Sequence, residues 1–154
     1  MGIAYSCDKD KGISYEVWEG LITGSDWVAH IRRQVADREW PAGDKSVTDV
    51  QMVSSDSSIE KADLEQVMAI YRAQPAKLAQ GRAAVVASQE FRSSQLFQIF
   101  TSRHGFRLIV FNDLNLACKW LGIDTKDAER SVNLLRAKLV GENSQQPRKT
   151  PPGH

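Results

Sequence analysis

The sequence predicts an α/β domain built on a mixed sheet of about five strands, with helices on its surface and an extra C-terminal helix. Short runs with the alternation of strands occur between segments with helical periodicity. Capping and turn residues stand at most of the junctions. Together with a length of 154 residues and a hydrophobic content of 42%, this strand and helix alternation favours one domain of the α/β class.

The first two strands are expected at residues 3–7 and 13–22, where apolar and polar side chains alternate. The residues between them, 8–12, end in Gly and have turn chemistry, so the simplest interpretation is an antiparallel hairpin. Trp18 falls on the face opposite Tyr15 and Val17. This side chain therefore needs cover from a helix or from another subunit.

A helix is expected after the hairpin, because Thr23 and Asp26 have the spacing of a capping box. Its apolar stripe ends before Pro41. His30 lies mostly off this stripe, as do the two arginines that follow it, and we expect all three on a solvated face. The third strand follows at residues 46–52.

A polar loop rich in serine separates the third strand from the next helix. Leu64, Val67, Met68 and Tyr71 recur with helical spacing. The helix is expected to begin between residues 58 and 62, with Ser57 and the glutamate three positions later as a capping box. Loops at the carboxyl ends of strands in an open α/β sheet are where ligands and partners dock, so function is expected near these serines.

The second half of the chain continues the alternation. Residues 83–87 form a small apolar run typical of a strand buried on both faces. Ser88 is expected to cap a helix that ends near residue 105, and a fifth strand is expected at 106–111. Asp113 and Gly122 are placed to start and stop a short helix. We predict an α/β domain over residues 1–123, an additional helix over 124–141 and a disordered tail over 142–154.

Charge and composition exclude several classes of function. Lys and Arg total 20 against 19 Asp and Glu, so a net charge of +1 gives no footprint for nucleic acid or an anionic membrane surface. No apolar run has the length of a membrane span, and no secretory signal is present, so a soluble cytoplasmic protein is expected. Cys7 and Cys118 stand alone and are expected to be small core residues.

Catalytic and metal-binding patterns are missing from the sequence. The three histidines are far apart, so we expect no metal and no cofactor. A carboxylate pair for acid and base catalysis would have to come from Asp49 and Asp56, and structural or solvated carboxylates are the preferred interpretation. The sequence therefore favours a protein that is not an enzyme.

Two segments carry a resemblance to a known family. The order of elements, together with Val110-Phe111-Asn112-Asp113 and Ala117-Cys118-Lys119-Trp120-Leu121-Gly122, resembles the SpoIIAA-like proteins of the STAS superfamily (sulfate transporter and anti-sigma factor antagonist) over residues 3–123. In anti-sigma factor antagonists, a strand leads through Asp-Ser-Ser into a helix, and a serine there is phosphorylated to release a partner. Asp56-Ser57-Ser58 looks similar, although Ile59 stands where that family has Gly.

The resemblance implies a non-catalytic binding or regulatory module that acts through a protein partner. Its candidate phosphoacceptor or partner-binding residues are Ser54, Asp56, Ser57 and Ser58. Serine in a polar loop is also an ordinary capping and turn residue, and this alternative stays open.

A second hypothesis is a carrier of a small apolar or lipid-like ligand. Folds related in shape to STAS hold lipids between helices, and Met68, Tyr71, Phe97 and Phe100 come from two successive helices that could flank such a pocket. The alternative is that these side chains only fill the core. The last helix either packs on the domain or forms a homodimer contact.

Overall fold

The structure is a computed structural model that describes residues 2–40, 45–74, 81–92 and 107–145. Its elements in chain order are β1 (Gly2–Asp8), β2 (Ile13–Gly20), α1 (Gly24–Ala36), β3 (Lys45–Val53), α2 (Lys61–Arg72), β4 (Arg82–Val86), α3 (Gln89–Arg92), β5 (Arg107–Phe111), α5 (Leu114–Leu121) and α6 (Thr125–Gln145).

The strands form one mixed sheet with the order β1-β2-β3-β4-β5. β1 pairs with β2 antiparallel through the predicted hairpin, and the remaining neighbours are parallel. The parallel neighbours are joined by crossover connections, of which α1 and α2 form the first two. The predicted fold class, a mixed sheet of five strands with surface helices, is therefore confirmed.

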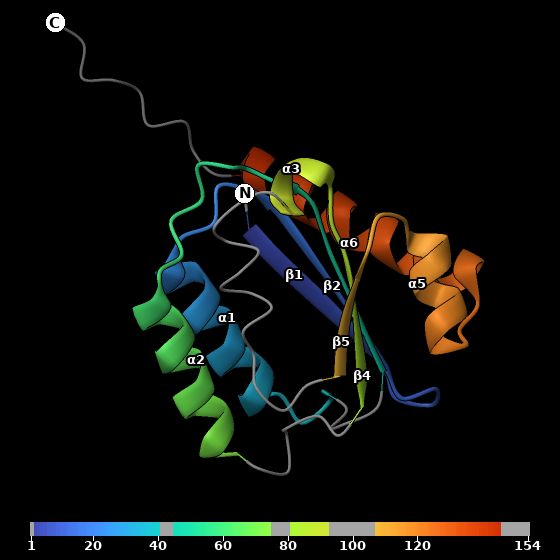
Figure 1. The fold of residues 1–154 in the computed structure, drawn as a ribbon, viewed down its shortest axis with the longest axis horizontal. Coiled ribbons are helices and arrows are strands. Elements are labelled where there is room, and N and C mark those ends of the chain that lie inside the picture. The colour runs from blue at the N-terminus through green and yellow to red at the C-terminus, as the bar shows by residue number, and fades with distance from the viewer. Residues whose placement is uncertain (1, 41–44, 75–80, 93–106, 146–154) are drawn as a thin grey trace, which may run out of the picture.

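Helices cover both faces of the sheet (Figure 1). α1 and α2 lie side by side on one face, and α5 and α6 cover the other. Successive side chains of β2 point to opposite faces of the sheet and so contribute to two separate cores. Tyr15 and Val17 belong to the core under α5 and α6, whereas Trp18 belongs to the core under α1 and α2. Trp18 is fully buried with its ring centroid 6.1 Å from that of Trp27 on α1. A helix, rather than another subunit, covers this tryptophan.

β4 lies inside the sheet and is buried on both faces, as its run of small apolar residues predicts. Ala84 and Val86 pack in the core under α5 and α6. Val85, which points the opposite way, packs in the core under α1 and α2.

Capping residues in the sequence correctly predict several helix ends. Thr23 and Asp26 form the predicted capping box at α1, with N to O distances of 3.1 and 2.9 Å. Asp113 accepts a hydrogen bond of 2.8 Å from Leu116 N at the start of α5. Gly122 ends α5 with a φ of 68°, a left-handed conformation that favours glycine.

The last helix is longer than the sequence predicts. α6 runs to Gln145, whereas the sequence places the end of this helix at residue 141. Leu135 and Leu139 are buried against the sheet, and this packing stabilises the helix beyond the weak helix former Gly141. The rest of the predicted tail, residues 146–154, lies outside the described residues, and so do Phe106 and the part of the helix predicted from Ser88 to about residue 105 that follows Arg92.

We also compared the helices with the requirements for a membrane span. Among the helices of the described ranges, none has both the length and the apolar character needed to cross a bilayer.

Candidate functional site

The loop between β3 and α2 carries the predicted serines, and we call residues 54–58 the serine loop. Ser54 N donates to Gly20 O over 2.8 Å, Ser58 N donates to Ile22 O over 3.0 Å, and Ser58 O accepts from Gly24 N over 3.0 Å. These bonds continue the parallel pairing of β2 and β3 beyond the ends of the strands. The serine loop is therefore attached along its length to the segment between β2 and α1.

The serine side chains have different roles within this loop. Ser57 is half-buried, and its Oγ accepts a hydrogen bond of 3.0 Å from Ile22 N. Ser54 Oγ accepts from Asp56 N over 3.2 Å, which closes a turn inside the loop. Ser58 is exposed, as is Asp56. Of the predicted phosphoacceptors, Ser58 is thus the one that solvent reaches most freely.

The predicted capping box at Ser57 is wrong. α2 begins at Lys61, within the expected window, and its N-cap is Glu60. Asp63 performs the capping, because its Oδ2 accepts a hydrogen bond of 2.8 Å from Glu60 N. Ser57 does not reach the helix, because its hydroxyl is used by Ile22 in the neighbouring segment.

The N-termini of α1 and α2 meet directly beside the serine loop. A Cβ atom added at Gly24, the first residue of α1, would lie 2.0 Å from Asp63 Oδ2. Glycine at this position therefore allows the carboxylate that caps α2 to approach the backbone of α1. The close approach fixes the two helix starts relative to each other and holds the loop between them.

Two large apolar side chains are exposed at the same end of the sheet. Met52, near the end of β3, is 61% exposed, and Leu21, which follows β2, is 41% exposed. Their strands are neighbours, and Ser54 N bonds to Gly20 O between them. We call these two side chains the apolar patch. Exposed polar and acidic residues follow Met52 along the chain, at Ser55, Asp56, Ser58 and Glu60.

A second group of polar side chains lies buried between β2 and α1, and the sequence analysis missed it. Glu16 accepts hydrogen bonds from Trp18 Nε1 and, over 2.7 Å, from Gln34 Nε2. His30 Nε2 lies 2.9 Å from Glu16 Oε2, and the histidine is fully buried. The expectation of a solvated His30 is wrong because α1 buries the series Trp27, His30, Ile31 and Gln34 against the sheet.

The position of Glu16 offered the signal that could have located this group. It alternates with Tyr15 and Val17 on a strand with little polar surface, so its carboxylate shares a face with Trp18. A carboxylate on a buried face needs donors. His30 and Gln34, four positions apart on the facing helix, are the side chains that can supply them.

Asp49 and Asp56, the only carboxylates considered as an acid and base pair, do not come together. Asp49 is 2% exposed on β3, and Arg136 of α6 contacts its Oδ2 over 2.8 Å. Asp56 lies in the exposed serine loop. Arg136 also contacts Glu19 Oε1 of β2 over 3.3 Å, so Asp49 forms part of an ion-pair group that attaches α6 to two strands.

The predicted apolar pocket can be followed only in part. Met68 and Tyr71 of α2 are buried, and the Tyr71 ring packs 6.5 Å from the ring of Trp40. Phe97 and Phe100 lie outside the described residues. The carrier hypothesis therefore stays a prediction.

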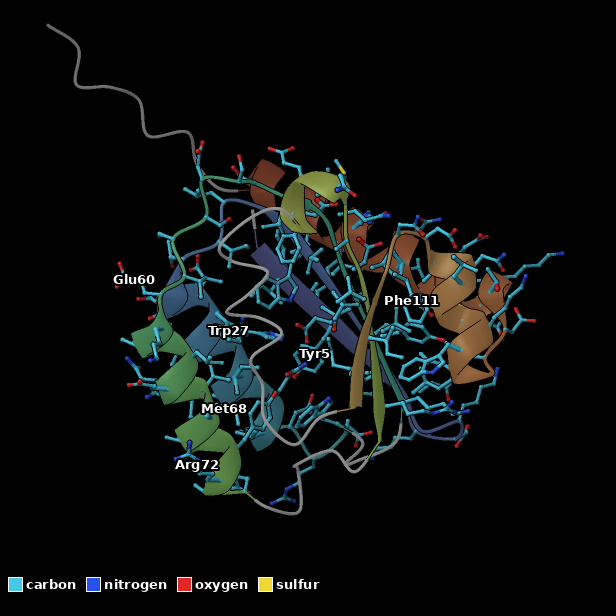
Figure 2. The ribbon with its side chains drawn as sticks, viewed as in Figure 1. Tyr5, Trp27, Glu60, Met68, Arg72 and Phe111 are labelled. Atoms are coloured by element: carbon cyan, nitrogen blue, oxygen red, sulfur yellow. The ribbon has the colours of Figure 1, made fainter. Side chains whose placement is uncertain are left out.

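A groove of about 400 Å³ opens along the outer edge of β1. Its floor is formed by residues 3–7, and its walls come from the C-terminal ends of α1 and α6. Tyr5, labelled in Figure 2, lines it and donates a hydrogen bond of 2.6 Å to Asp37 Oδ2. Burial and this bond raise the pKa of Tyr5 to about 12.

The cysteines have different environments, and both are free thiols. Cys118 is buried in the core under α5 and α6, and burial raises the pKa of its thiol. Cys7 is half-buried and lines the groove. In the described ranges, no group of three or more His, Cys, Asp or Glu side chains is arranged to hold a metal ion.

The element order and sheet topology define a SpoIIAA-like fold. The chain is similar to the crystal structure of an uncharacterised protein of the DUF3478 family from Shewanella loihica PV-4, which has this fold. The TM-score is 0.53 at 13% sequence identity, and the match covers 78% of this chain and 94% of the other. No protein-family model matches the sequence, and no curated protein matches it. The likeness confirms the fold that the resemblance implied.

Proposed function

We propose that this chain is a non-catalytic binding module that docks a protein partner on the serine loop and the apolar patch beside it. The observation that carries the proposal is the ordered presentation of Met52 and Leu21, which are 61% and 41% exposed, next to a loop held by backbone hydrogen bonds. A surface that is ordered before binding loses little conformational entropy on association. Exposed Met is also enriched at protein interfaces.

The charges around this patch favour a partner of a particular kind. Asp26, Asp56 and Glu60 are exposed in the segments that follow Leu21 and Met52, and Lys61 directly follows Glu60. An acidic rim around an apolar centre favours a partner whose apolar surface carries Lys or Arg at its edge.

We further propose that Ser58 is the position at which this interaction is regulated. Its side chain is exposed, whereas the Ser57 hydroxyl accepts the hydrogen bond from Ile22 N. A phosphate on Ser58 would add about 1.5 to 2 negative charges beside Asp56 and Glu60. Burying those charges under a partner costs more free energy than their attraction to Lys or Arg at the partner's edge returns, so modification would release the partner.

Affinity capture from the host lysate tests the docking surface. The chain, Met52→Asp and the control Leu116→Asp are immobilised separately, and the retained proteins are compared by mass spectrometry. Leu116 of α5 is a suitable control because it is also a large exposed apolar side chain, at 45%. We expect a partner that the chain and Leu116→Asp retain and that Met52→Asp loses at least about tenfold. The same retention on all three baits would contradict the proposal.

The regulatory position is tested with the captured partner. Ser58→Asp is expected to weaken binding, and Ser58→Ala is expected to bind like the unchanged chain. Ser57→Ala removes the acceptor for Ile22 N, so it is expected to lower the free energy of unfolding by about 1 kcal/mol whether or not a partner is bound. If Ser58→Asp binds as tightly as Ser58→Ala, Ser58 does not regulate the interaction.

A further inference from the structure

Within the described ranges, β1 is a sheet edge without the features that usually protect one. It is terminal among the described strands, and its seven residues pair with β2 without a register shift. It contains no proline, and its only charged residue is Asp8 at the last position. In an antiparallel pair, every second residue directs its N–H and C=O away from the partner. β1 therefore presents a row of hydrogen-bonding groups that another strand could use.

The groove leaves room for such a strand. It follows residues 3–7 of β1, with Tyr5 at its centre, and its walls come from helices on opposite faces of the sheet. Arg33 and Asp37 line it from the end of α1, and Lys138 and Glu142 line it from α6. An added strand would lie between these two helix ends and contact both.

The charges of the two walls have the same arrangement. On each wall a cation precedes a carboxylate by four residues: Arg33 of α1 and its C-cap residue Asp37 on one side, and Lys138 and Glu142 on the other. Lys138 and Glu142 share one face of α6, whereas Asp37 lies just past the last residue of α1. Glu39 also lines the groove, and it forms an ion pair of 2.6 Å with Lys9. The walls therefore display charges of both signs.

This arrangement is complementary to itself. A two-fold axis places a surface opposite the same surface of a second copy, so an isologous interface needs both signs within one patch. When two copies of α6 lie antiparallel across such an axis, Lys138 of one copy faces Glu142 of the other. Arg33 faces Asp37 in the same way on the other side of the sheet. A partner whose charges all have the same sign would meet both attractive and repulsive charges on these walls.

We infer that the β1 edge is a homodimer interface, in which two copies of β1 pair antiparallel about Tyr5 and join the two sheets into one. The interface is separate from the serine loop and goes beyond the proposed function. It assigns to Lys138 and Glu142 a role in partner choice, because these charges fit a second copy of the chain.

Charge exchange at α6 tests the interface. The unchanged chain, Lys138→Glu, Glu142→Lys and the double variant with both substitutions are compared by sedimentation equilibrium over a range of concentrations. Lys138 and Glu142 are both exposed, so the substitutions should leave the fold intact, which circular dichroism checks. Each single variant opposes like charges at two symmetric places, and we expect dimerisation to weaken about tenfold or more. The double variant should return to within about threefold of the unchanged chain.

Hydrogen exchange then tests the strand pairing itself. Alternate amides of β1 should exchange more slowly at concentrations where the dimer forms, because they become bonded to the second strand. Four outcomes overturn the inference: an unchanged chain that stays monomeric at every concentration, a dimer that Lys138→Glu does not weaken, a double variant that remains as weak as the single variants, and β1 amides that exchange equally fast in monomer and dimer.

Discussion

Several polar side chains in this protein contact partners on neighbouring elements. Glu16 receives donors from its own strand and from α1, and fully buried His30 lies against the same carboxylate. Tyr5 extends the polar group toward the groove, with its ring centroid 5.5 Å from that of His30. Buried polar groups of this kind are costly when one partner is removed, so they favour one packing arrangement of α1 on the sheet.

Tyr5 gives a prediction for the pH dependence of stability. Burial, followed by the hydrogen bond to Asp37, raises its pKa from 10.0 to about 12. The folded state thus holds this proton more tightly than the unfolded state. The stabilisation is fully present below pH 10 and is lost as the pH rises to about 12. Tyr5→Phe should cost about 1 kcal/mol near neutral pH and should remove this part of the alkaline loss.

Urea unfolding at several pH values measures this difference. Tyr15→Phe is the control, because burial is the first cause of the raised pKa of Tyr15 and no side-chain hydrogen bond contributes to it. That variant should leave neutral-pH stability nearly unchanged. If Tyr5→Phe and the unchanged chain differ by the same free energy of unfolding at neutral and alkaline pH, the Tyr5 assignment is wrong.

At the scale of elements, the ends of helices divide into two kinds. The starts of α1 and α5 and the stop of α5 follow from residues within one helical turn, and the sequence predicts all three. The start of α2 does not, because the side chain expected to cap it, Ser57, bonds to Ile22 instead. A loop serine has several possible acceptors and donors, and only the neighbouring segment decides which of them it uses.

The attachment of α6 gives the second prediction. Arg136 contacts Asp49 and Glu19, and Asp49 is 2% exposed. Arg136→Met leaves a buried carboxylate without its cation and should lower the free energy of unfolding by about 3–5 kcal/mol. Adding Asp49→Asn should recover part of this loss, because the amide carries no charge.

Chemical denaturation measures these variants against a surface pair on the same helix. Arg130 contacts Asp127 over 3.4 Å with its side chain 70% exposed, so Arg130→Ala should cost less than about 1 kcal/mol. A similar effect of Arg136→Met and Arg130→Ala would show that the ion-pair group does not hold α6.

At the scale of the whole molecule, α6 completes one of the two cores. Ala128, Val132, Leu135 and Leu139 are buried together with Tyr15 and Val17 of β2 and with residues of β1 and β4. The sequence left open whether this helix packs on the domain or serves a dimer. The structure packs its apolar stripe on the sheet and leaves the flank with Lys138 toward the groove.

Truncation is the third prediction. The sequence predicts that residues 1–123 form the α/β domain, but a chain of these residues lacks α6. Burial of each large apolar side chain contributes about 1.5–3 kcal/mol, and the net stability of a domain is only about 5–15 kcal/mol. We expect the 1–123 chain to lose cooperative thermal unfolding and the control chain of residues 1–145 to keep it. Equal melting temperatures for the two chains would show that α6 is an accessory.

The sequence by itself determined the order of the elements, the sheet class and the caps of α1 and α5, because these depend on periodicity and on contacts within a few residues. Tertiary structure decided the burial of His30, the pairing of Asp49 with Arg136 and the use of Ser57 by Ile22, a residue 35 positions away. It also decided that the C-terminal ends of α1 and α6 line one groove along β1. Periodicity reports which face of an element is apolar, whereas the partner of a polar side chain depends on elements brought together only by folding.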